Sequence, residues 1–198
     1  QISSALIQGP NLIAAGGAEV LTGLVFGFAL RLMIYALQIA GTIAAQSTSL
    51  SQLFGGGAID PQPALGVVLV IGGLALATLL GFHVKIAAML ILSYDIVSPG
   101  QLLPPGPLAG WALAAVGQSF RLALVLATPF LLASLLYNLA LGAINRAMPQ
   151  LMVAFVGAPA ITLGALILLT LTGPLLLSVW VGILEGRLAD PLGLTHGR

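Results

Sequence analysis

Residues 138–160 read NLALGAINRAMPQLMVAFVGAPA, a dense series of polar residues, glycines and prolines between long apolar runs. Residues three and four apart share one side of a helix, so a helix over this stretch carries a polar stripe on one face. The stripe consists of Asn138, Gly142, Asn145 and Arg146. Pro149 restricts the residue before it and cannot continue the hydrogen-bond ladder, which predicts that the helix ends near Met148.

After Gln150, the sequence predicts a short apolar link over residues 151–156. Gly157 and Pro159 are then expected to change the direction of the chain before the next helix begins. The stretch therefore reads as a joint between two helical segments.

The composition indicates a membrane or membrane-assembled protein. Of the 198 residues, 59% are hydrophobic and only 6% are charged, with a mean hydropathy of +1.14, whereas soluble domains carry about 25% charged residues. The six basic and five acidic residues are scattered singly, so no basic face binds nucleic acid. The chain has no cysteine, which excludes disulfides and thiol chemistry.

The first long apolar run, residues 12–45, carries Glu19, Gly23, Gly27 and Arg31 at four-residue steps, so these residues share one helix face. Two glycines at this spacing let a second helix approach closely, and we interpret the face as a packing surface. Glu19 and Arg31 lie about 18 Å apart along a helix and cannot pair with each other. Each needs a partner from another helix, another subunit or water.

Residues 46–63 read as a flexible loop whose main apolar bulk is Leu53 and Phe54. No Gly-Lys-Ser/Thr follows the three glycines of this loop, so it is not a phosphate-binding loop.

Residues 64–82 form a candidate membrane span of about 28 Å. His83 and Lys85 follow it, and we expect an interfacial histidine and a lysine that extends toward water. Residues 86–97 are too short to span the bilayer and are expected to return as the second arm of a hairpin.

Residues 108–147 form another long apolar run, which Pro129 should kink. Residues 161–184 are the last apolar segment, and Trp180 near its end is expected to anchor at the membrane interface. Residues 185–198 form a polar tail that we expect to be frayed.

Catalytic constellations are not visible in the sequence. His83 and His196 are far apart, so they do not complete a zinc motif or a Ser-His-Asp set. Asp60, Asp95 and Asp190 fall in separate segments, which argues against a buried acidic pair. We expect no enzyme, no cofactor and no metal.

The order of these motifs resembles the FliR family of flagellar export-gate proteins. The signature-like stretch is residues 138–160, with the spelling Leu-Gly-x-x-Asn-Arg, and FGGGAIDP, the pair Gly81 and His83, and SYDIVSPG at residues 93–100 fall in the family's order. The resemblance covers the whole chain, residues 1–198, as a single FliR-type domain. Family members have a further apolar segment before the start of this chain, so we expect an N-terminal helix to be missing.

The resemblance implies an all-α membrane-associated fold of bent helical hairpins, of the type III export-gate FliP/FliQ/FliR kind, with a non-standard transmembrane topology. It implies one subunit of the flagellar type III export gate in the bacterial inner membrane, within the flagellar basal body. The implied partners are FliP, FliQ, a FlhB-type switch protein, a FlhA-type export protein, membrane lipid and unfolded flagellar proteins as cargo.

By the same resemblance, the loop of residues 46–63 corresponds to a plug loop, and Leu53 and Phe54 are the candidate gasket residues. The triple glycine departs from the bulkier residues that are usual there. The candidate assembly residues are Glu19, Gly23, Gly27, Arg31, Asn138, Gly142, Asn145, Arg146, Pro149 and Gln150. The signature residues among them are equally well explained as a polar cluster at a helix end.

Two alternatives to a flagellar gate subunit stay open at this point. One is the homologous SctT-type subunit of an injectisome, which the spelling of the signature disfavours. The other is a small-solute membrane transporter, which would place charges at a midplane site between repeated halves, although the sequence shows no repeat.

Overall fold

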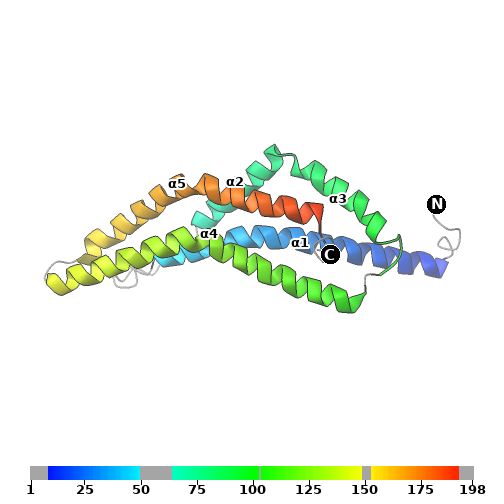
Figure 1. Cartoon of the computed structure of the whole chain (residues 1–198), viewed down its shortest axis with the longest axis horizontal. Helices are drawn as coiled ribbons and strands as arrows, with labels where there is room; N and C mark the ends of the chain where they lie inside the picture. The colour runs from blue at the N-terminus through cyan, green and yellow to red at the C-terminus, as the bar shows by residue number, and fades with distance from the viewer. Residues whose placement is uncertain (1–8, 50–63, 103, 149–152, 192–198) are drawn as a thin grey trace.

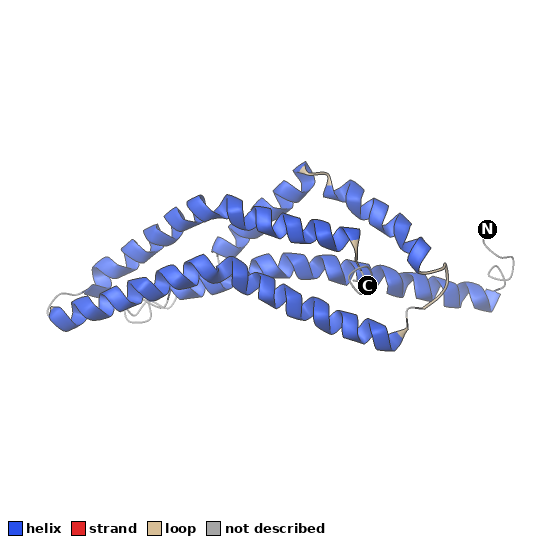
Figure 2. Cartoon of the chain, viewed as in Figure 1, coloured by secondary structure: helices blue, strands red, loops and turns tan. Residues whose placement is uncertain are grey.

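The computed structural model of the chain describes residues 9–49, 64–102, 104–148 and 153–191, and the regular structure there is helical. The helices are α1 (Gly9–Ser49), α2 (Ala64–Leu79), α3 (Phe82–Ile96), α4 (Pro105–Ala147) and α5 (Val153–Ala189). Figures 1 and 2 show these helices in an elongated arrangement. The expected all-α fold is confirmed.

The three long helices exceed the thickness of a membrane. α1, α4 and α5 contain 41, 43 and 37 residues. At 1.5 Å per residue they are about 55–65 Å long, against a hydrocarbon core of about 30 Å. Each contains a segment apolar enough to cross a bilayer, and α2 with α3 forms a further pair bent by 72°. The long helices therefore either tilt strongly or extend out of the lipid.

The helices are arranged around α1, which packs mainly against α4 and α2. α4 and α5 run back along each other as a hairpin whose tip forms one end of the molecule (Figure 1). α2 and α3 form an inverted V on one side. The hairpin expected over residues 64–97 is thus a bent pair of helices. α2 ends at Leu79, and its length of about 24 Å is too short to span the bilayer alone.

The centre of the core is Trp180 of α5, which is 1% exposed. Its indole Nε1 donates a hydrogen bond to the carbonyl of Met33 in α1 over 2.8 Å. The expectation that Trp180 anchors at the membrane interface is wrong, because a neighbouring helix covers the ring and accepts the hydrogen bond from its indole N–H. The other large, fully buried side chains are Phe26, Leu37, Leu126 and Phe130.

Glycines allow α2 to approach this centre. A Cβ atom on Gly41 of α1 would lie 2.0 Å from the Cα of Gly66 in α2, so the two backbones touch. A Cβ atom on Gly73 of α2 would lie 2.6 Å from Leu37 and 3.6 Å from Trp180. Close helix contact in this chain therefore uses glycines other than the pair that the sequence pattern singled out.

The prolines lie inside continuous helices and do not end them, and both α4 and α5 are bent along their length in Figure 1. Gly157 and Pro159 do not redirect the chain, since both lie within α5 together with Pro174. Pro129 lies within the continuous helix α4, where the Thr128 hydroxyl donates to the Leu124 carbonyl over 2.8 Å. Pro129 has no N–H to donate to the Val125 carbonyl, and the Thr128 hydroxyl adds a bond to the neighbouring carbonyl of the same turn.

The polar tail begins inside a helix, because α5 continues to Ala189. Arg187 donates to the side chain of Gln118 in α4. Trp111 of α4 donates from its indole Nε1 to the carbonyl of Pro191 over 3.0 Å. These contacts fix residues 185–191, which were expected to be frayed.

The contact between Gly41 and Gly66 leads to a first prediction. Gly41→Ala should force α1 and α2 apart and lower the free energy of unfolding by about 1–3 kcal/mol, as overpacking does. The thermal midpoint in detergent, followed by tryptophan fluorescence, measures this loss.

Gly66→Ala is the matched control, because its Cβ would lie 3.4 Å from the nearest atom, the Gln38 carbonyl oxygen, in ordinary contact. Equal midpoints for the two variants would contradict the close approach of α1 and α2.

Candidate assembly site

The described parts of the signature stretch are the last turns of α4 and the first turns of α5, which lie at one end of the molecule (Figure 1). α4 ends at Ala147, and the Met148 N–H caps it by donating to the Ile144 carbonyl over 2.8 Å. The predicted helix end near Met148 is thereby confirmed. Pro149 and Gln150 lie outside the described residues.

The polar stripe of α4 faces away from the rest of the chain. Gly142, Asn145 and Arg146 are exposed, and Asn138 is partly buried. A Cβ atom on Gly142 would have open space around it. Within the described ranges, no hydrogen bond or ion pair holds the side chains of Asn145 and Arg146. These side chains are therefore available to a neighbour or to solvent.

Tyr137, one residue before the stripe, joins the two helices of the hairpin. Its hydroxyl donates to the carbonyl of Gly157 in α5 over 2.5 Å. A Cβ atom on Gly157 would lie 3.1 Å from this hydroxyl oxygen, so a larger residue would crowd the bond. This hydrogen bond thus ties α5 to α4 two residues before Pro159.

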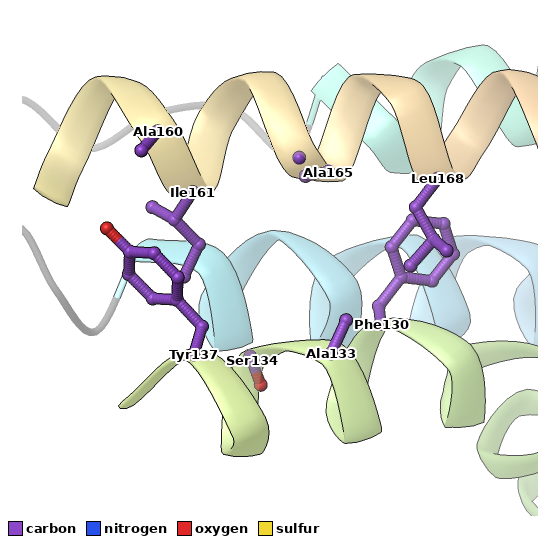
Figure 3. A pocket seen from close by; sticks show the side chains of 9 residues that line it. Phe130, Ala133, Ser134, Tyr137, Ala160, Ile161, Ala165 and Leu168 are labelled. Atoms are coloured by element: carbon purple, nitrogen blue, oxygen red, sulfur yellow. The ribbon is translucent and has the colours of Figure 1, made fainter. Parts of the chain in front are cut away.

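Beside Tyr137, α4 and α5 enclose a cavity of about 140 Å³ (Figure 3). Its polar lining side chains are Ser134 and Tyr137, and the Ser134 hydroxyl donates to the Leu131 carbonyl over 3.0 Å. Because both hydroxyl donors are already used, the cavity suits an apolar group. The remaining lining residues are Phe130, Ala133, Ala160, Ile161, Gly164, Ala165 and Leu168.

The charged residues of α1 have partners of different kinds. Glu19 accepts hydrogen bonds from the Tyr94 hydroxyl and from the Gly100 N–H, each over 2.9 Å. Glu19 was expected to need a partner outside its own helix, and α3 with the turn after it supplies that partner. Arg31 is exposed and lies over the ring of Tyr35 in its own helix, 5.2 Å from the ring centroid.

Gly23 and Gly27 are not used for packing within the described chain. A Cβ atom on either glycine would meet nothing within 4 Å, and both residues are exposed. The large apolar side chains at neighbouring positions, Val20, Leu24 and Phe28, are also exposed. Exposed residues of the segment 20–31 form an open face, which we call the α1 face: Val20, Gly23, Leu24, Gly27, Phe28 and Arg31.

An ion pair that the sequence did not predict joins α3 to α5. Lys85 Nζ lies 2.5 Å from Glu185 Oε1, and it also lies 4.6 Å from the centroid of the Phe82 ring. Lys85, which was expected to extend toward water, is 44% exposed and in addition pairs with Glu185. The two charges are 100 residues apart, and only the V-shaped course of α2 and α3 brings them together.

The candidate gasket residues Leu53 and Phe54 lie outside the described residues. Across the described ranges, no three histidine or acidic side chains come close enough to hold a metal ion. The described residues instead present two exposed surfaces that the chain does not cover itself, at the end of α4 and on the α1 face.

Comparison with known proteins identifies what kind of chain carries these surfaces. The family model described as bacterial export proteins, family 1, matches residues 2–186. A flagellar biosynthetic protein FliR from Caulobacter vibrioides is 35% identical over 170 residues, which are 83% of this chain and 68% of the relative. The FliR protein of Aquifex aeolicus is 32% identical over 80% of this chain and 62% of its own length. No solved structure matches.

The hydrogen bond from Tyr137 leads to a second prediction. Tyr137→Phe keeps the ring but removes the donor to Gly157, and it should lower the free energy of unfolding by about 0.5–1.5 kcal/mol. Thermal unfolding in detergent measures the change.

Tyr35→Phe serves as the control, because its hydroxyl makes no hydrogen bond to the described residues while its ring still underlies Arg31. An equal loss in both variants would show that the bond to Gly157 does not stabilise the hairpin.

Proposed function

Because the chain belongs to the FliR family of bacterial export proteins, we propose that it forms the gate of the flagellar type III export apparatus together with FliP and FliQ. The family places the chain in the export apparatus of the bacterial inner membrane, as a transport component and not an enzyme. The specific partners and the gate role are the proposal.

The observation that carries the proposal is the small share of apolar surface that the chain buries by itself. In the three candidate spans, only 28%, 33% and 22% of the apolar window is buried. The helices are also about twice as long as the bilayer is thick, so lipid alone cannot cover them. Neighbouring subunits are the natural cover for the remainder.

The α1 face favours a protein neighbour over lipid. Lipid tails cover any apolar surface. The exposed glycines at positions 23 and 27 have no side chains, so the backbone of another helix can come close to α1 there. Glu19 and Arg31 bound this face and supply polar groups at its two ends. We assign the α1 face to a helix of a neighbouring gate subunit.

The polar stripe of α4 is the second proposed contact. Asn145 and Arg146 offer donors at an exposed helix end, and Asn138 and Gly142 extend the same face. Pro149 and Gln150 follow directly in sequence and are included in this proposal. An assembly role accounts for donors that the described chain does not use itself.

The proposal also assigns roles to residues and partners outside these two surfaces. Leu53 and Phe54 are proposed to seal the closed channel with their apolar side chains. A FlhB-type switch protein and a FlhA-type export protein complete the proposed set of partners, and unfolded flagellar proteins are the proposed cargo.

Co-purification tests the proposal and the α1 face together. The full-length protein should co-purify with FliP and FliQ after co-expression, and a monodisperse monomer that ignores both would reject the proposal. Gly23→Leu with Gly27→Leu should reduce recovery of the complex at least about tenfold, since each added side chain would block a close helix contact.

Gly182→Leu is the matched control for bulk, because Gly182 of α5 is likewise exposed with open space around its Cβ position. The glycine double variant should keep the thermal midpoint of the parent chain. Normal complex recovery in the double variant would exclude the α1 face as a subunit contact.

The gasket proposal predicts a change in ion leakage. Leu53→Ala with Phe54→Ala should raise ion leakage through the assembled gate in cells, because two bulky apolar groups leave the channel. Leu171→Ala with Leu175→Ala, two exposed leucines of α5, is the control. Unchanged leakage in the first double variant would reject the gasket role.

A further inference from the structure

We infer that α3 is a hinged arm that swings away from the other four described helices, and that two polar contacts hold it closed. This inference rests on the proposed function, because a channel subunit has to change shape when cargo passes. The arm is α3, Phe82–Ile96.

The hinge is the short joint between α2 and α3. The two helices meet at 72°, and two residues, Leu80 and Gly81, separate them. Gly81 has φ 71° and ψ 27°, the left-handed conformation that glycine adopts without steric cost. A Cβ atom on Gly81 would meet nothing within 4 Å. No other part of the described chain packs against this side of the joint, and its angle is set by backbone hydrogen bonds from the Gly81 N–H to the Thr78 carbonyl and from the Val84 N–H to the Gly81 carbonyl.

The arm contributes two side chains, Phe82 and Met89, to the core, so opening exposes them while the contacts among the other four described helices persist. Its inner face buries Phe82, Met89 and Ser93, whereas most of its other side chains are exposed. α1, α2, α4 and α5 contact one another around Trp180 without it. The buried Ser93 hydroxyl donates to the Leu90 carbonyl over 2.7 Å, within the arm itself. Opening therefore leaves that hydroxyl paired.

The first contact that holds the arm is the ion pair between Lys85 and Glu185, near the hinge. It joins the first turns of α3 to the end of α5. The two side chains are 44% and 49% exposed, so water competes with the pair. Exposed ion pairs are weak and separate readily, which suits a contact that must be reversible.

The second contact is at the far end of the arm, where one carboxylate holds two groups. Glu19 accepts the Tyr94 hydroxyl of α3 with Oε2 and the Gly100 N–H of the following turn with Oε1. When these bonds separate, both the arm and the turn that leads to α4 are released from α1. The polar ties that hold the arm to α1 and α5, as far as the chain is described, are thus at its two ends.

Because the chain has no cysteine, distances can be measured with spin labels. Ile91→Cys on the arm and Leu113→Cys on α4 are both exposed and form the reporting pair. Leu132→Cys on α4 and Leu163→Cys on α5 form a control pair away from the arm. Pulsed electron spin resonance is recorded on the full-length protein purified with FliP and FliQ, or alone if they do not co-purify.

In the variant Lys85→Glu with Tyr94→Phe, the distances of the reporting pair should shift to longer values and those of the control pair should stay unchanged. Adding Glu185→Lys restores opposite charges near the hinge and should move the distances back toward the parent. Arg121→Glu reverses an exposed charge on α4 and should change neither pair.

Unchanged distances in the reporting pair would overturn the inference, and so would equal shifts in both pairs, which would indicate general loosening. The same shift in Arg121→Glu would overturn it as well. These outcomes are distinct from failure of the proposed function, which shows itself as a parent protein that does not co-purify with FliP and FliQ.

Discussion

The contact between α5 and α1 at Trp180 is the constraint on which the rest of the fold depends. The indole donates to the backbone of Met33, and the ring packs where Leu37 and Gly73 converge. An unpaired indole N–H in an apolar interior is costly, so this geometry fixes both the depth and the rotation of α5 against α1. Gly41 and Gly66 then let α2 approach the same centre.

The sequence predicted the helical class, the family and the end of α4, because composition, motif order and Pro149 are local signals. It did not predict which glycines would touch. Gly23 and Gly27 have the spacing of a helix contact yet remain open, whereas Gly41 and Gly66 meet across a gap of 25 residues. Only tertiary structure pairs such positions, and the same holds for Lys85 with Glu185 and for the burial of Trp180.

The change of direction expected at Gly157 and Pro159 does not occur, for a related reason. Pro159 and Pro174 each remove one donor, but a long helix that is packed and hydrogen-bonded on both sides of a proline stays continuous. In α5, the Tyr137 hydroxyl adds a tie beside the first of these prolines. A hydrogen bond from a hydroxyl on an adjacent helix cannot be predicted from the sequence of the helix that accepts it.

The length and continuity of α1 affect how force passes through the molecule. From Glu19 to Ser49 it is one uninterrupted helix, which is about 45 Å long at 1.5 Å per residue. A hydrogen-bonded helix of this kind resists stretching, so a push or twist applied at the carboxylate of Glu19 is transmitted to Ser49, four residues before Leu53 in the sequence. The two ends of α1 therefore move together.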